Sequence, residues 1–200
     1  MQDSVLGWRD AISDLWHAHM PAWTAAENFG FATSDQYIAF CASKDWIQDT
    51  GEALVAHRQR GFSADPWAAY LEFWGILQAA VVQQDAIDEM TYSLTGTRPE
   101  PRPKGTAWTQ LRDLRNLAAG HPNNKSTGRN RPPMRCASGR EGKSYQQIPI
   151  IIYGDEKHRA QNIHLADMLD RYVAEASLEM KAIFTQFERL ILRLDATQKT

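Results

Sequence analysis

The feature that most constrains the fold of this chain is a long heptad pattern near its C-terminus. Between residues 160 and 195, apolar residues recur at spacings of three and four, namely Ala166, Leu169, Val173, Ala176, Met180, Ile183, Phe187, Leu190 and Leu194. Such spacing places an apolar seam along one side of a helix. It predicts a long helix that packs along its neighbours in a bundle or across a dimer interface.

Three further helices are predicted ahead of this one from apolar stripes and from the residues that end or cap them. The first covers residues 3–19 and stops before Pro21. The second begins at Ser34 or Asp35 and stops at Gly61. The third starts at Asp65-Pro66, with Asp as the cap and Pro at the first helical position, and runs to about Leu94.

The second half of the chain is more irregular before the long helix begins. Residues 95–106 form a proline-rich connection, and Thr106 is expected to cap a fourth helix that begins near Ala107. Residues 122–159 are expected to form a basic loop and a strand insertion, in which residues 144–153 pair with residues 134–138 as a hairpin. The fold class predicted is therefore all-α: one domain over residues 1–200, an antiparallel helical bundle with a short β-hairpin or strand insertion before the long C-terminal helix.

Charge is distributed unevenly along the chain, although the formal net charge is only -2. The segment from Arg98 to Lys143 holds eleven Lys and Arg against three Asp and Glu, whereas the remainder holds eleven against 21. A basic segment on an acidic body is typical of a surface that faces phosphates, although a solvated loop would have the same composition.

Several classes of protein are disfavoured by what the sequence lacks. Two distant cysteines suggest neither a disulfide framework nor a zinc site, and no HExxH or CxxC spacing occurs. No glycine-rich phosphate loop or GxSxG element occurs either, so we expect no metal and no cofactor. The apolar runs are too short to span a bilayer and the N-terminus lacks a signal pattern, which predicts a cytoplasmic protein with no membrane partner.

Residues 111–125, LRDLRNLAAGHPNNK, form a helix that is predicted to stop at a histidine. On an ideal α-helix Arg115 and His121 would lie about 240° apart around the axis and would not share a face. Gly120 and Pro122 bracket the histidine and are expected to end the helix there. His121 would then be able to turn back towards the end that carries Arg115 and Asn116.

This Arg115-Asn116…Gly120-His121-Pro122 pattern resembles the signature of the HEPN superfamily, in which an arginine, often followed by a polar residue, precedes a histidine by a few positions. The resemblance implies an α-helical bundle, usually a homodimer, and often a metal-independent ribonuclease. It implies catalytic roles for Arg115, Asn116 and His121.

The chemistry of RNA cleavage explains why these residue types suit the reaction. The 2′-hydroxyl of RNA can attack its own phosphate once a base takes its proton, and histidine suits that transfer because its pKa is about 6.5. Arginine suits the charged phosphorane because its planar fork donates two hydrogen bonds. Asn116 would orient the histidine or the phosphate, and a homodimer would supply the second Arg–His pair.

Further residues are predicted to assist this site. Arg115 would be supported by Asp85, Gln84 and Arg112. Asp85 and Gln84 lie on the apolar stripe of the third helix, where polar groups need partners, and the arginines of the fourth helix are the natural ones. Four basic residues would contact the RNA backbone, namely Lys125, Arg129, Arg131 and Arg135.

Alternatives remain open at this point. Arg115 could form a structural ion pair with Asp85 or Asp88, His121 could cap a helix end, and the third helix could simply emerge into solvent. The function predicted is a metal-independent endoribonuclease in a toxin, anti-phage or stress-response setting, with an antitoxin protein as a further partner if it is a toxin. The competing hypothesis is a non-catalytic helical module for dimerisation or RNA binding.

Overall fold

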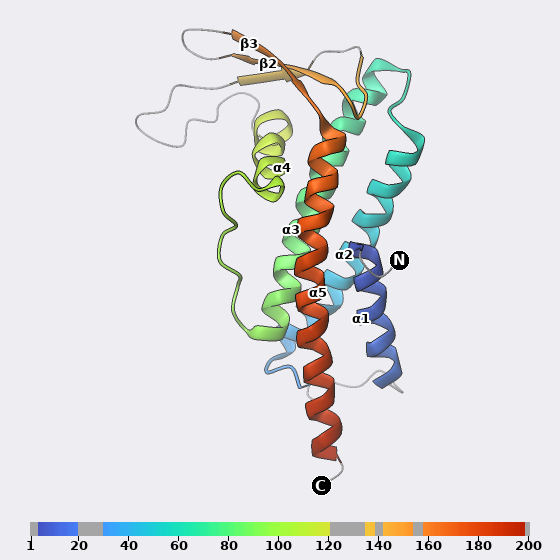
Figure 1. The fold of residues 1–200 in the computed structure, drawn as a ribbon, viewed down its shortest axis with the longest axis vertical. Helices are drawn as coiled ribbons and strands as arrows, with labels where there is room; N and C mark the ends of the chain where they lie inside the picture. The colour runs from blue at the N-terminus through green and yellow to red at the C-terminus, as the bar shows by residue number, and fades with distance from the viewer. Residues whose placement is uncertain (1–3, 20–29, 121–134, 139–141, 154–157, 199–200) are drawn as a thin grey trace, which may run out of the picture. The chain divides into compact units, whose positions relative to one another are not determined.

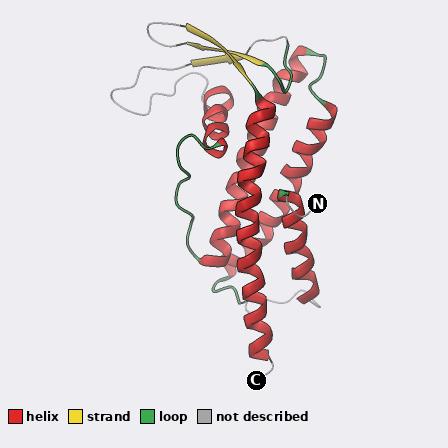
Figure 2. Cartoon of the chain, in the orientation of Figure 1, coloured by secondary structure: helices red, strands yellow, loops and turns green. Residues whose placement is uncertain are grey.

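A computed structural model describes residues 4–19, 30–120, 135–138, 142–153 and 158–198 of the chain. These residues form mainly helices (Figures 1 and 2), which are α1 (Val5–His19), α2 (Ser34–Arg60), α3 (Pro66–Thr95), α4 (Ala107–Arg115), the π-helical turn η2 (Asn116–Gly120) and α5 (Leu165–Gln198). Three strands precede α5, namely β1 (Arg135–Ser138), β2 (Ile148–Tyr153) and β3 (His158–Ile163). The protein is thus mainly α-helical, as predicted.

Two of the predicted helix starts are confirmed by their capping hydrogen bonds. Asp65 accepts a 2.7 Å hydrogen bond at Oδ1 from the backbone N–H of Ala68, just before α3. Thr106 accepts a 3.3 Å bond at Oγ1 from the backbone N–H of Thr109, at the start of α4. Both side chains satisfy donors that the first helical turn leaves without a partner.

The predicted hairpin is also confirmed, but it has a third strand. β1 pairs antiparallel with β2, with Cys136 opposite Ile152, and β2 pairs antiparallel with β3, with Ile150 opposite Gln161. The expectation that the long helix begins at residue 160 is therefore wrong at its start, because residues 158–163 form β3 and α5 begins at Leu165. Backbone pairing with β2 holds these polar residues in an extended conformation.

The described residues divide into two compact units. The first contains residues 1–52, 82–101 and 173–200, and the second contains residues 53–81 and 102–172. Helices α2, α3 and α5 each contribute a segment to both units. The prediction of one domain over the whole chain stays a prediction. Within the described parts, no helix combines the length and the apolar character needed to cross a membrane.

The first unit is held together by aromatic packing between helical segments. Phe40 of α2 stacks on Phe187 of α5 at 5.0 Å between ring centroids and contacts Trp16 of α1 at 4.7 Å. Phe40 and Phe187 are both fully buried. Trp8 of α1 lies 5.5 Å from Phe184 of α5. Burial of such rings contributes a large share of core stability, so this unit is a small helical bundle.

The apolar seam of α5 follows the heptad prediction in its middle, whereas Ala166, Leu190 and Leu194 near its ends are only half-buried. Met180, Ile183 and Phe187 are buried, as are Leu169 and Ala176. Val173, which the pattern placed on the seam, is instead 40% exposed, and the neighbouring Tyr172 is fully buried. A straight α-helix drifts relative to a strict seven-residue repeat, so one seam position can rotate out of the core.

The second unit joins α4, the sheet and the start of α5. Trp108 of α4 packs edge-on against Tyr172 of α5, with 5.6 Å between ring centroids. Ile148 and Ile150 of β2 are buried and alternate with less buried neighbours, as expected for a strand with one covered face. The backbone N–H of Ala166 donates a 2.8 Å hydrogen bond to the carbonyl of Tyr145, which ties the first turn of α5 to the segment before β2.

Candidate functional site

The predicted motif begins in the last turn of α4, within the second unit. Leu111 and Leu114 are buried at 0% and 6% exposure, so they form the apolar stripe that the sequence predicted. Arg112 and Arg115 lie in the last turn and are half-buried. The helix thus places two guanidinium groups close to its C-terminus, where positive charge interacts favourably with the helix dipole.

A π-helical turn follows α4 over Asn116–Gly120. The backbone N–H of Asn116 is shared between the carbonyls of Arg112 and Asp113. A π turn closes wider rings than an α-helix and is often found at functional sites. The angle of about 240° that an ideal α-helix would give does not apply here, because residues 116–120 have π geometry. His121 itself lies outside the described residues, so its position relative to Arg115 stays a prediction.

The guanidinium of Arg115 is not fully satisfied by the described residues. Its Nε atom is buried and has no hydrogen-bond partner among them. A buried polar group without a partner costs about 1–3 kcal/mol. Such a group in a native structure requires an explanation, and a ligand that supplies an acceptor is one.

The remaining predicted residues are placed as follows. Gln84 is fully buried, whereas Asp85 is exposed. Both belong to the first unit, while Arg112 and Arg115 belong to the second, so support of Arg115 by Gln84 and Asp85 stays a prediction. Arg135 is the first residue of β1, opposite Tyr153. Lys125, Arg129 and Arg131 lie outside the described residues.

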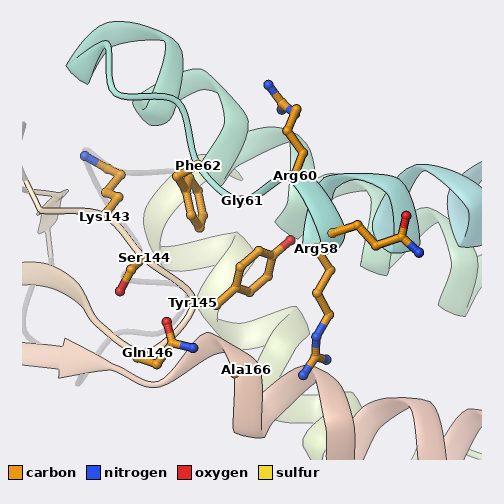
Figure 3. Close-up of a pocket in the computed structure, with 10 residues that line it drawn as sticks. Arg58, Arg60, Gly61, Phe62, Lys143, Ser144, Tyr145, Gln146 and Ala166 are labelled. Atoms are coloured by element: carbon orange, nitrogen blue, oxygen red, sulfur yellow. The ribbon is translucent and has the colours of Figure 1, made fainter.

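The second unit also contains a polar pocket that the sequence did not predict. It has a volume of about 360 Å³ and is lined by Arg58, Gln59, Arg60, Gly61, Phe62, Lys143, Ser144, Tyr145, Gln146 and Ala166. Figure 3 shows Tyr145 between Phe62 and Arg58. Three segments far apart in the chain form the pocket: the end of α2, the segment before β2, and the first turn of α5.

A series of polar contacts connects Tyr145, which lines the pocket, through His57 to Glu72. The hydroxyl of Tyr145 lies 2.8 Å from His57 Nδ1, and His57 Nε2 lies 3.5 Å from Glu72 Oε2. The second distance is longer than an ordinary hydrogen bond, so Nε2 is only weakly satisfied. A carboxylate can only accept, so in neutral His57 the proton belongs on Nε2 and Nδ1 accepts from the Tyr145 hydroxyl.

Burial and charge set the ionisation of these groups. Burial raises the pKa of Tyr145 to about 12, so its phenol keeps its proton at neutral pH. Burial alone would raise the pKa of Glu72, but the Ser63 N–H, Arg60 and His57 outweigh it and hold that pKa below its usual value. The Ser63 N–H donates a 2.8 Å bond to Glu72, and Arg60 Nη2 lies 2.9 Å from it.

Three cationic side chains line the pocket. Arg58 donates hydrogen bonds to both carboxylate oxygens of Asp170, and the bond from its Nη2 is 2.9 Å long. Arg60 forms an ion pair with Glu72. Lys143 is buried to 9% exposure, with its Nζ 5.3 Å from the centre of the Tyr70 ring. Burial lowers the pKa of Lys143.

Nothing in the local sequence could have revealed this pocket. His57 and Tyr145 are 88 positions apart, and neither belongs to a spaced motif. The one hint in the sequence is that Lys143 ends the basic segment and lies two positions before Tyr145.

Comparison with known proteins adds no relative: no protein-family model, no curated protein and no solved structure matches this chain. In the part of the chain that the structure describes, no group of three or more His, Cys, Asp or Glu side chains is placed to hold a metal ion.

Proposed function

We propose that the chain is a metal-independent endoribonuclease of the HEPN type. The observation that carries the proposal is the buried Nε of Arg115, which has no hydrogen-bond partner among the described residues. It stands one residue before the π turn that leads to His121. A scissile phosphate would supply the acceptor that this guanidinium lacks, in the geometry that a planar fork prefers.

In the proposed reaction His121 acts as the general acid and base, Arg115 binds the phosphate and Asn116 orients the reacting groups. Removal of the proton from the 2′-hydroxyl lets that oxygen attack phosphorus, and the 5′-oxygen leaves with a proton, so the products carry 2′,3′-cyclic phosphate and 5′-hydroxyl ends. A homodimer would bring two copies of the motif together. The mainly helical fold is compatible with this assembly.

The test is cleavage of a mixed-sequence RNA in EDTA by the wild type and by three variants. We expect His121→Ala and Arg115→Lys to lose at least a hundredfold in rate, because Lys keeps the charge but not the fork. Arg159→Ala removes an exposed arginine on β3 and should cleave like the wild type. The products should carry cyclic phosphate ends.

A folded dimer that leaves RNA intact at micromolar concentration would contradict the proposal. The alternative, a non-catalytic module for dimerisation or RNA binding, would then be favoured. The same conclusion would follow if His121→Ala cleaved as fast as the wild type.

A further inference from the structure

The part of α3 that belongs to the second unit exposes an apolar face. Trp67 is 59% exposed and Leu71 is 64% exposed, whereas Phe73 on the opposite side of the helix is fully buried. Trp74 is half-buried and Gln78 is exposed. At about 100° per residue these four positions lie within about 60° of one another around the helix axis. Together Trp67, Leu71, Trp74 and Gln78 form one surface, which we call the α3 stripe.

The α3 stripe carries no charge. Between Pro66 and Val81 the only charged residue is Glu72, which lies off the stripe and pairs with Arg60. A surface helix normally turns charged side chains towards solvent on the face opposite the core. Large apolar side chains that gather on an exposed face usually mark a site of interaction with another macromolecule. The stripe therefore has the composition of an interface rather than of ordinary surface.

An uncharged stripe suits contact with a second copy of itself. In a twofold-symmetric dimer the same patch of both copies meets, so charges near the axis would face like charges at a cost of several kcal/mol. A strongly charged partner would instead need opposite charges, which the stripe does not offer. Gln78 also fits contact between identical surfaces, because an amide carries both hydrogen-bond donors and an acceptor.

We propose that the α3 stripe is the interface of a homodimer in which two copies of α3 pack antiparallel about a twofold axis. With the axis between Leu71 and Trp74, each Leu71 packs against Trp74 of the second copy, and each Trp67 lies beside Gln78 of the second copy. The Trp67 indole N–H can then donate to that amide oxygen. Tryptophan is among the residue types that contribute most to binding energy at protein interfaces.

This interface would supply the homodimer that the proposed ribonuclease needs, but it rests only on the exposed face of α3. Sedimentation velocity at micromolar concentration tests it, and we expect the wild type to sediment as a dimer. Leu71→Glu should weaken the dimer by about a hundredfold or more, because it places two like charges near the axis. Leu178→Glu is the matched control, since Leu178 is a leucine of α5 that is 70% exposed outside the stripe, and this variant should remain a dimer.

A mixture of two variants tests whether the stripe meets itself. Position 71 of one copy lies close to position 71 of the other across the proposed axis. Leu71→Glu and Leu71→Lys should therefore each be monomeric alone, whereas an equimolar mixture of the two should form dimers because the charges are then opposite. Contact of the stripe with any other surface would not give this rescue.

A monomeric wild type would overturn the proposal and leave the stripe to a different partner. A dimeric Leu71→Glu, or a mixture of the two variants that stays monomeric, would also overturn it. Circular dichroism establishes that the variants are folded. RNA cleavage is a separate measurement: a dimer that leaves RNA intact contradicts the proposed ribonuclease alone, and a monomer that cleaves RNA contradicts the proposed interface alone.

Discussion

The contact between Tyr145 and His57 should stabilise the folded protein at neutral pH. Tyr145 is 7% exposed, and its hydroxyl lies 2.8 Å from His57 Nδ1. Tyr145→Phe keeps the ring contacts with Phe62 and His57 but removes the hydroxyl. The substitution leaves the half-buried imidazole nitrogen without that partner.

At neutral pH this change should destabilise the protein by about 1–3 kcal/mol, the usual cost of a buried polar group that loses its partner. For a chain of 200 residues this corresponds to a fall of about 2–12 °C in melting temperature. Tyr153→Phe is the matched control, because Tyr153 is 37% exposed on β2 and its substitution should change the melting temperature by less than about 2 °C.

The pH dependence of the same variant provides a second, independent reading. Burial raises the pKa of Tyr145 from 10.0 to about 12 in the folded protein. The protonated phenol therefore makes its full contribution to the free energy of unfolding below pH 10. This contribution is lost as pH rises from about 10 to about 12. Two pKa units correspond to roughly 2–3 kcal/mol.

Tyr145→Phe lacks this titration, so its deficit relative to the wild type should shrink above pH 10. Denaturant unfolding of both proteins at pH 8 and at pH 11 measures the difference. The reasoning is refuted if the deficit at pH 8 is below about 0.5 kcal/mol, or if the deficit is the same at both pH values.

Two further predictions concern the helices and the ion pairs. Gly75→Ala meets no atom within 4 Å and should stabilise its helix by about 0.5–1 kcal/mol. Gly51→Ala should gain less, because its new methyl carbon would lie 2.6 Å from Leu6 Cδ2 and that side chain would have to shift; thermal melts in which Gly51→Ala is the more stable variant would contradict this. Glu72→Gln should lower the free energy of unfolding at pH 7. Because the pKa of Glu72 is lowered in the folded protein, the difference between variant and wild type should shrink as pH falls below the ordinary value of 4.5. Denaturant unfolding of both proteins at pH 7 and at pH 3.5 measures this difference.

Local signals in the sequence predicted most of the helices and the hairpin. Asp65-Pro66 and Thr106 fix the starts of α3 and α4 through a single capping side chain each, and such interactions involve residues three apart. β3 could not be found in this way. His158–Ile163 is polar and exposed except at its last residue, so it lacks the alternation that reveals a strand. Its pairing with β2 is a tertiary interaction.

The same distinction separates the two candidate sites. Arg115, Asn116 and His121 could be predicted as candidates because the motif is contiguous, although the π turn between them could not be predicted from helical periodicity. The pocket around Tyr145 depends instead on ion pairs such as Arg58–Asp170, which join positions 112 residues apart.

The two sites also differ in how a substitution in each is tested. Arg115 belongs to a local motif, so its role is tested by the rate of RNA cleavage, and Arg60→Gln should leave that rate unchanged. Arg60 belongs to a pocket made by tertiary contacts and pairs with Glu72, so its role is tested by the melting temperature of the protein. If either substitution altered both properties equally, a shared loss of folded structure in the second unit would explain the effects better than two separate sites, since both arginines lie in that unit.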